Sequence, residues 1–178
     1  VNIAHTPESN MKLCSGIAPI RTCVDIGIPV GLGTDGCASN NDLDMFREMD
    51  KAAKLGKVSE KDPTSLDART VMQMATSKAA SAIGMGDFIG TLEVGKCADI
   101  IVIDTDVPHL CPLYDPYSAL VYAARGSDVR DVLIDGAVVM KNRRFTNLNP
   151  GEVLSRVRRL VKEGLAGSGK TIAFMQVP

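Results

Sequence analysis

Histidine is scarce in this sequence: only His5 and His109 occur among its 178 residues. Histidine is the commonest side-chain ligand of transition metals and the commonest general acid or base near neutral pH. Two such residues limit the metal or acid–base chemistry that this chain can carry out by itself.

Long apolar runs and an excess of either charge are also missing. Gly, Pro or a charged residue interrupts every apolar stretch before it reaches the ~20 residues of a membrane span. The 20 Lys and Arg residues nearly balance the 21 Asp and Glu residues, so the net charge is −1. This balance argues against a protein that binds nucleic acid or a membrane surface. With 45% hydrophobic and 23% charged residues, the composition excludes wholesale disorder.

The five cysteines are odd in number and contain no C-x-x-C pair. This pattern favours reduced thiols in a cytoplasmic protein over a disulfide framework or a zinc knuckle. The chain begins Val-Asn-Ile-Ala-His, without Met and without a charged segment before an apolar core. We therefore expect no signal peptide here, and the start is compatible with an internal fragment of a longer protein.

The first 85 residues alternate between predicted strands and helices. Strands are predicted over residues 1–5 and 28–34, and the second is uncharged, which is typical of a strand buried on both faces. Pro7, Ser9 and Asn10 predict a loop after the first strand. Helices are expected over residues 19–25, 43–55 and 62–83, with Gly56 beyond the end of the second. This alternation predicts an α/β protein with a parallel sheet or barrel.

From residue 86 the pattern changes to turns and short strands. Strands are predicted over residues 98–104, 129–135 and 137–141, and Asp135-Gly136 favours a tight hairpin between the last two. Short helical segments are expected over residues 116–125 and 151–163, the latter clearly amphipathic. We therefore divide the chain into four parts: 1–85, 86–145, a helix over 146–163, and a flexible tail over 164–178.

Residues 164–171, Gly-Leu-Ala-Gly-Ser-Gly-Lys-Thr, match the phosphate-binding pattern G-x-x-x-x-G-K-[ST]. That mechanism requires a strand before the loop and a helix after it, so that the phosphate lies on a helix N-terminus. Here a predicted helix precedes the motif, and the seven residues after it include a proline. A flexible tail is therefore the favoured interpretation, and nucleotide binding is the weaker alternative.

The sequence Gly33-Thr34-Asp35-Gly36 ends the most apolar predicted strand. Barrel folds carry their chemistry at the C-terminal tips of strands. However, an aspartate at a strand end often only caps the next turn. The residues alone leave both roles of Asp35 open.

Four segments carry a further signal: residues 5–13 (HTPESNMKL), 33–36 (GTDG), 39–45 (SNNDLDM) and 90–99 (GTLEVGKCAD). Together they resemble the amidohydrolase superfamily. The resemblance extends over roughly residues 1–163 and is closest to the branch of 5-methylthioadenosine/S-adenosylhomocysteine deaminases and related aminohydrolases. It implies a C-terminal fragment of a (β/α)8 barrel, with the last two strands and their helices, plus part of a small β-sandwich.

The same resemblance implies roles for individual residues. Asp35 corresponds to the aspartate that ligates the catalytic divalent metal, zinc or iron, and accepts a proton from the metal-bound water, whose pKa is about 7. His5, Ser9 and Asn10 correspond to a substrate-side motif, in which Thr6 replaces the family's Asn. His5 would either contact substrate or orient this loop. His109 falls in the sandwich part and is expected to be structural.

The family's other metal-binding and catalytic histidines have no counterpart in this chain. We therefore expect the C-terminal part of a metal-dependent amidohydrolase that hydrolytically deaminates an adenosine-type or related heterocyclic substrate. The chain alone is expected to be inactive and not to retain the metal. Its expected partners are the missing N-terminal portion or another copy of itself. The alternative is a non-catalytic assembly module that self-associates through exposed strand edges and apolar faces.

Overall fold

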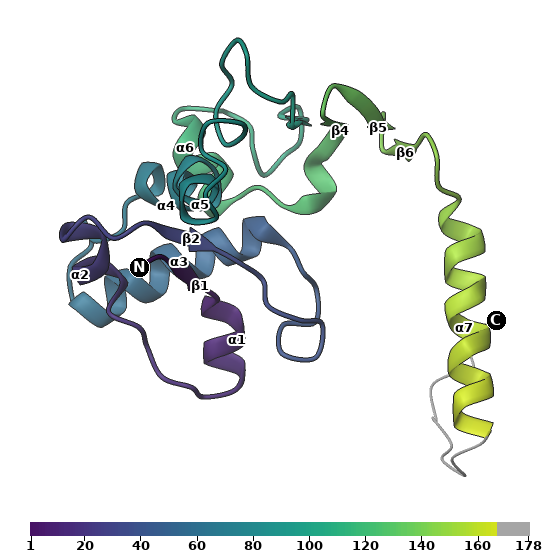
Figure 1. Cartoon of the computed structure of the whole chain (residues 1–178), viewed down its shortest axis with the longest axis horizontal. Coiled ribbons are helices and arrows are strands. Elements are labelled where there is room, and N and C mark those ends of the chain that lie inside the picture. Colours follow the sequence, from purple (N-terminus) through teal and green to yellow (C-terminus); the bar gives the residue numbers. More distant parts are fainter. Residues whose placement is uncertain (167–178) are drawn as a thin grey trace. The chain divides into compact units, whose positions relative to one another are not determined.

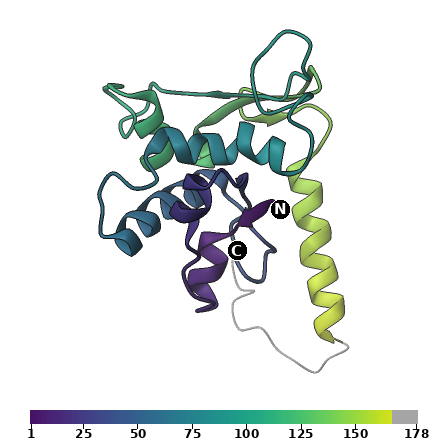
Figure 2. The same ribbon diagram turned by 60° about the vertical axis from the view of Figure 1, so that its left-hand side comes forward.

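The computed structural model describes residues 1–166, which fall into two units, Val1–Arg143 and a second that begins at Arg144. The strands of the first unit are β1 (Ile3–His5), β2 (Val30–Leu32), β3 (Ile100–Ile103), β4 (Val129–Ile134) and β5 (Ala137–Lys141). Its α-helices are α1 (Pro7–Lys12), α2 (Ile20–Asp25), α3 (Met45–Glu60), α4 (Ala68–Ala75), α5 (Ser77–Ala82) and α6 (Pro116–Tyr122). Figures 1 and 2 show this arrangement from two sides. The mixed α/β content agrees with the predicted fold class.

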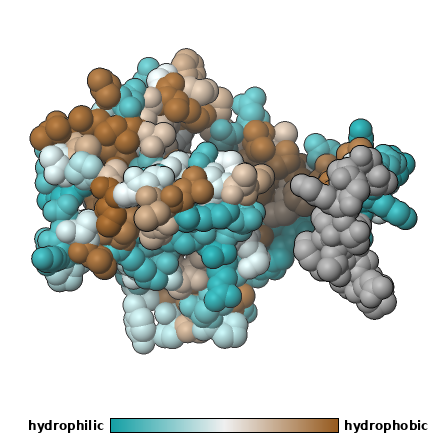
Figure 3. All heavy atoms as spheres, turned by 90° about the horizontal axis from the view of Figure 1, so that it is seen from below, coloured by the Kyte–Doolittle hydropathy of each residue, from teal (hydrophilic) through white to brown (hydrophobic). Residues whose placement is uncertain are grey.

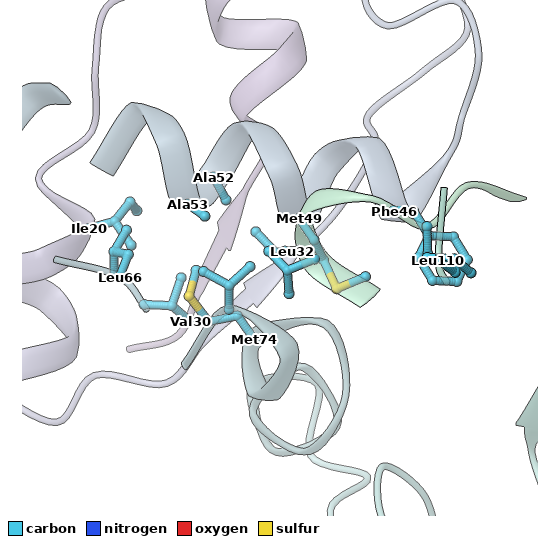
Figure 4. Packing of buried hydrophobic residues seen from close by; sticks show 13 residues of the cluster. Ile20, Val30, Leu32, Phe46, Met49, Ala52, Ala53, Leu66, Met74 and Leu110 are labelled. Carbon is cyan, nitrogen blue, oxygen red and sulfur yellow. The ribbon is translucent and has the colours of Figure 1, made fainter. Parts of the chain in front are cut away.

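Strands β1 and β2 form a parallel pair, with Ile3 opposite Val30 and His5 opposite Leu32. All three residues of β2 are buried, as the uncharged run predicts. Figure 4 shows why: the side chains of Val30 and Leu32 lie between the residues of α3 and Met74 of α4. This packing removes β2 from water and fixes the position where the strand ends.

Helix α1 occupies residues for which a loop was predicted. The proline that suggested a loop stands in the first turn of the helix, where its missing N–H costs nothing and its fixed φ favours helix. Glu8 in the first turn and Lys12 in the last turn also suit the helix dipole. The prediction was wrong because proline at a helix start and proline in a loop have the same sequence signature.

Helix α3 runs through Gly56 to Glu60, beyond its predicted end. Gly56 is needed inside the helix because Leu66 packs directly on it. A Cβ atom at position 56 would lie 2.4 Å from Leu66 Cδ1 and 2.9 Å from its Cγ, and Leu66 is only 2% exposed. The helix ends instead at Lys61, whose φ of 55° is left-handed.

The single helix predicted over residues 62–83 is two helices, α4 and α5. Asp67 caps α4 by accepting from the Thr70 N–H (2.9 Å). The break lies at Thr76, whose φ of −130° and ψ of −98° are not helical. The Thr76 hydroxyl donates to the Met72 carbonyl at 2.8 Å, so the side chain satisfies an acceptor at the end of α4.

Strands β3, β4 and β5 form an antiparallel sheet in that order. The predicted hairpin between β4 and β5 is present, and Asp135 (φ 47°) and Gly136 (φ 77°) both have the positive φ that a type I′ turn requires. The five cysteines are free thiols.

The second unit contains β6 (Arg144–Phe145) and the predicted amphipathic helix, α7 (Pro150–Ala166). Its apolar stripe is exposed over Val153, Leu154, Val157, Leu160 and Val161. The first three residues of the Gly164–Thr171 motif belong to α7, and the rest of the motif lies outside the described residues. Among residues 1–166, no helix combines the length and the apolar character needed to cross a membrane.

The contact between Gly56 and Leu66 leads to a stability prediction. Gly56→Ala should lower the free energy of unfolding by about 1–3 kcal/mol through overpacking, although Ala is the better helix former by about 1 kcal/mol. Leu66→Ala alone should cost about 2–5 kcal/mol. In that background Gly56→Ala should cost much less, because the two closest atoms, Cδ1 and Cγ, are removed and only the 3.2 Å contact with Cβ of residue 66 remains. Denaturant unfolding followed by circular dichroism measures all four proteins, and stabilisation by Gly56→Ala in the original chain would contradict the packing argument.

Candidate active site

Asp35 stands just beyond the C-terminal end of β2 and is exposed to solvent. The Gly33 N–H donates to the His5 carbonyl at 3.0 Å, so the ends of β1 and β2 are held together immediately before it. Asp35 has a left-handed φ of 60°, a conformation that aspartate tolerates better than most residues. The backbone turns sharply here and presents the carboxylate at the strand end.

Two serines hold the Asp35 carboxylate. Ser9 Oγ of α1 donates to Asp35 Oδ2 at 2.7 Å, and Ser39 Oγ donates to the same oxygen at 2.6 Å. Hydrogen bonds from Ser39, Ser9 and the Gly36 N–H lower the pKa of Asp35 below its ordinary value. The group is therefore an oriented carboxylate anion at neutral pH.

Asn40 organises the loop that follows Asp35. It is 3% exposed, and its side-chain amide donates to the Thr34 carbonyl at 2.8 Å and to Glu48 Oε1. Its Oδ1 accepts from the N–H groups of Asp42 (3.3 Å) and Leu43 (3.2 Å). Both amide hydrogens and both acceptor positions are thus used, as a buried amide requires.

Glu48 is a buried carboxylate on α3 that sequence reasoning missed. It is 0% exposed, and its Oε2 accepts from the Glu8 N–H at 3.3 Å. Burial raises the pKa of Glu48 above its ordinary value, against the effect of its hydrogen bonds from Glu8 and Asn40. One signal was available in the sequence: Glu48 lies beside Met49 and four residues before Ala52, on the side of the helix that is otherwise apolar.

His5 is buried at the end of β1. It is 4% exposed and lines a cavity of about 10 Å³ with residues of α2 and α3, among them Ile20 and Ala52. Such a cavity holds at most a single water molecule. Desolvation lowers the pKa of His5 to about 4, so the ring is neutral at pH 7.

The remaining site residues of the sequence prediction are Ser9 and Asn10. Ser9 is 3% exposed and bonded to Asp35, whereas Asn10 follows it on α1, half-buried, with its carbonyl accepting from the Ser15 N–H at 2.9 Å. The structure therefore brings Ser9 to Asp35, and it adds Ser39.

The second histidine has a structural contact, as expected. His109 Nε2 lies 2.8 Å from Asp128 Oδ2, and the same carboxylate oxygen accepts from the Arg125 N–H at 2.9 Å. Asp128 is 4% exposed. This pair fixes the segment before α6 to the turn before β4.

Whether the described residues can bind a metal ion depends on how many ligands they contain. Asp35 fits a ligand of a divalent cation, because it is exposed, ionised and oriented by its neighbours. Among residues 1–166, however, no three His, Cys, Asp or Glu side chains are grouped closely enough to hold a metal ion. A catalytic metal normally has three or four protein ligands, so the described residues do not complete such a site by themselves.

Comparisons with known proteins all identify relatives of one family. The Amidohydrolase family profile matches residues 1–139. The 5-methylthioadenosine/S-adenosylhomocysteine deaminase of Syntrophobacter fumaroxidans is 55% identical over 162 residues, which are 91% of this chain and 37% of that protein. The 5′-deoxyadenosine deaminase of Methanosarcina acetivorans is 49% identical over 166 residues, 93% of this chain and 38% of that protein.

Solved structures agree. The crystal structure of an adenosine deaminase from Xanthomonas campestris with bound zinc is 40% identical and has a TM-score of 0.90, covering 92% of this chain and 37% of that one. Atrazine chlorohydrolase from Arthrobacter aurescens TC1, complexed with zinc, is 29% identical with a TM-score of 0.79, covering 90% and 36%. The chain therefore spans a little over a third of the length of these relatives.

Burial of His5 leads to a prediction on pH. Its folded pKa of about 4 lies below the unfolded value of about 6.5, so between these values the unfolded chain binds the proton and the folded chain does not. The contribution of His5 to the free energy of unfolding should be fully present above pH ~6.5. The free energy of unfolding should fall by up to about 3 kcal/mol as the pH is lowered to ~4.

Denaturant unfolding across this range, compared with His5→Gln, isolates the contribution of His5 from that of the carboxylates. The variant should lose this part of the pH dependence, and the control His109→Gln should retain it. Parallel pH profiles for the original chain and His5→Gln would show that the His5 ring is not buried as described.

Proposed function

Because the chain belongs to the amidohydrolase family, we propose that it is the C-terminal part of a metal-dependent hydrolase that deaminates an adenosine-type or related heterocyclic substrate. The observation that carries the proposal is the Asp35 carboxylate, fixed by Ser9 and Ser39 at the adjoining ends of β1 and β2. The names of the deaminases that match this chain at 45–55% identity support the substrate class.

The proposed parent fold is a (β/α)8 barrel beside a small β-sandwich. In this proposal β1 and β2 are the last two barrel strands, with residues 1–85 belonging to the barrel and residues 86–145 to the sandwich. The parallel pairing of β1 with β2 and the antiparallel sheet of β3, β4 and β5 support that division. Asp35 would then lie at the C-terminal face of the barrel, where such enzymes place their chemistry.

The divalent metal, zinc or iron, would be held by Asp35 together with ligands from the rest of the parent protein. When bound, it would supply a water molecule whose pKa is lowered to about 7. The bound zinc in the structures of two relatives supports this choice of cofactor. With one ligand of its own, this chain is proposed not to retain the metal by itself.

Asp35 performs the proton transfer in this proposal. Water adds to the amino-bearing ring carbon, the C–N bond breaks, and ammonia leaves, so that a ring carbonyl replaces the amino group. As an ionised carboxylate, Asp35 can accept the proton that the attacking water gives up. Ser9 and Ser39 fix the orientation of the carboxylate. Because their hydrogen bonds lower its pKa, Asp35 is ionised at neutral pH and can accept a proton.

The other candidate residues take more limited roles. His5 packs against α2 and α3, which supports the role of orienting the segment after β1 over that of contacting substrate. Ser9 is proposed as a positioning residue, because its buried hydroxyl is bonded to Asp35. Asn10 remains the candidate for contact with substrate.

Substitution of Asp35 tests the proposed function directly. In the complete parent polypeptide, Asp35→Asn should lower the deamination rate by about 10²–10⁴-fold, the usual contribution of a general base. Asp25→Asn, which removes an exposed carboxylate paired with Arg21, is the matched control and should retain activity. The assay follows ammonia release from S-adenosylhomocysteine, and full activity of the 178-residue chain alone with added Zn²⁺ would refute the proposal.

Association is the second candidate function, and exposed apolar surface favours it. A groove of about 470 Å³ beside α4 and α5 is lined mainly by apolar residues, including Met72, Ile83, Leu92 and Ile101. Ile83, Leu92 and Ile101 are exposed at 50–77%, and Figure 3 shows apolar side chains among the polar ones on one face. We propose that the missing portion of the parent, or another copy of this chain, covers such surface.

Size-exclusion chromatography with light scattering tests this second candidate. At micromolar concentration the isolated chain should elute as a dimer or larger species, because exposed apolar patches drive association. Leu92→Ser with Ile101→Ser should shift it toward the monomer. A monomer in the unsubstituted chain would show that these faces do not associate.

A further inference from the structure

The buried carboxylate of Glu48 is unused in the proposed reaction, yet it touches both segments that hold Asp35. Glu48 Oε2 accepts from the N–H of Glu8, and Glu48 Oε1 accepts from the side-chain amide of Asn40. The next residue after Glu8 is Ser9, and the residue before Asn40 is Ser39. Each segment therefore presents one residue to Glu48 and its neighbour to Asp35.

We propose that Glu48 is a positioning residue. By holding the two segments that carry Ser9 and Ser39, it keeps both serine hydroxyls on Asp35 Oδ2. This inference rests on the proposed function of Asp35 and adds a residue to it. Glu48 reaches the first segment through a backbone N–H and the second through a side chain that also holds the Thr34 carbonyl (2.8 Å). The carboxylate thus connects α3, the start of α1 and the residue before Asp35.

Burial makes this connection rigid. Glu48 is 0% exposed and Asn40 3% exposed, so water cannot replace either hydrogen bond without opening the structure. Removing one partner would leave a buried polar group unsatisfied, at a cost much larger than the net gain of the hydrogen bond. Lys51 of α3 forms an ion pair with the side chain of Glu8. Glu8 is therefore held through its side chain as well as through its backbone N–H.

A glutamine at position 48 would keep the volume of the side chain but could accept only through one oxygen. Its amide nitrogen would face one of the two donors, Glu8 N–H or Asn40 Nδ2, and that contact would become repulsive. Glu48→Gln should therefore loosen one of the two serines while leaving the core around α3 filled. Asp50→Asn is the matched control, since Asp50 lies on the same helix and pairs with Lys54 at 2.5 Å.

Hydrogen exchange of the 178-residue chain is the first measurement. In Glu48→Gln, the amides of Ser39, Asn40 and Asn41 or that of Asn10 should exchange about 10–100-fold faster, while amides of α4 keep their rates. Asp50→Asn should leave all of them unchanged. Unchanged exchange at both segments in Glu48→Gln, or an equal acceleration over the whole chain, would overturn the proposal.

The second measurement uses the complete parent polypeptide. Glu48→Gln should lower kcat by about tenfold, because it misdirects the carboxylate that accepts the proton. In a Ser9→Ala/Ser39→Ala background, Glu48→Gln should have little further effect on kcat, since its route to Asp35 is already removed. An equal loss of kcat in both backgrounds would show that Glu48 acts only through general stability.

The two arms separate the failure of this inference from that of the proposed function. An unsubstituted parent without deaminase activity would refute the proposed function, and the exchange measurement would still decide whether Glu48 holds the two segments. If Glu48→Gln does not fold, Asn40→Ser removes the hydrogen bond between Asn40 and Glu48 instead. It should give the same local increase in the rate of hydrogen exchange. Asn40→Ser with unchanged exchange at Ser39 would then overturn the proposal.

Discussion

Complete burial of one short strand is the constraint on which the rest of this structure depends. Strand β2 has no residue more than 9% exposed, and it contacts β1 and the helices α2, α3, α4 and α5. Fully burying a Val or Leu side chain contributes about 1.5–3 kcal/mol, and the packing around it admits few alternative arrangements. Because the strand cannot shift, the residue at its end has a fixed position from which a carboxylate can act.

Polar groups near the strand end are arranged in two layers. The outer layer is the exposed Asp35 with the hydroxyls of Ser9 and Ser39 that bind its carboxylate. The inner layer is Asn40 and Glu48, which are buried and bonded to each other. The pKa directions follow the layers: hydrogen bonding lowers the pKa of the outer carboxylate, and desolvation raises that of the inner one. Two carboxylates in one small region therefore have different environments, one exposed and ionised, the other buried and hydrogen-bonded.

The sequence predicted the order of the elements better than their limits. Uncharged residues around Val30 and the Asp135-Gly136 turn were sufficient for β2 and for the hairpin, because each depends on local chemistry. Gly56 was wrongly taken as lying beyond the end of its helix, since only the packing of Leu66, ten residues later, explains a glycine inside it. The break at Thr76 also depends on a hydrogen bond that no periodicity reveals.

For the site, the sequence predicted Asp35 through a strand-end motif and a family resemblance, and in the structure it lies beyond the end of β2 with two serine hydroxyls on its carboxylate. Ser39 was within the recognised motif but without a role. Glu48 was missed because a charged residue among apolar helix positions is usually assigned to the solvent side, and its partners, a backbone N–H of α1 and a loop asparagine, both lie outside its own helix. His5 was considered for the substrate side, although its ring packs in the helix layer.

The hydrogen bonds that hold Asp35 have one further property: they all connect residues between Glu8 and Glu48. The longest of them joins residues 40 apart, and the serine bonds span 26 and 4 residues. Separations of 26 and 40 residues are long-range, so these bonds form only after the chain has met the entropy cost of closing the loops between them. The support of the carboxylate is therefore complete only when α1, the loop after β2 and α3 have packed together, so it depends on the tertiary fold around β2.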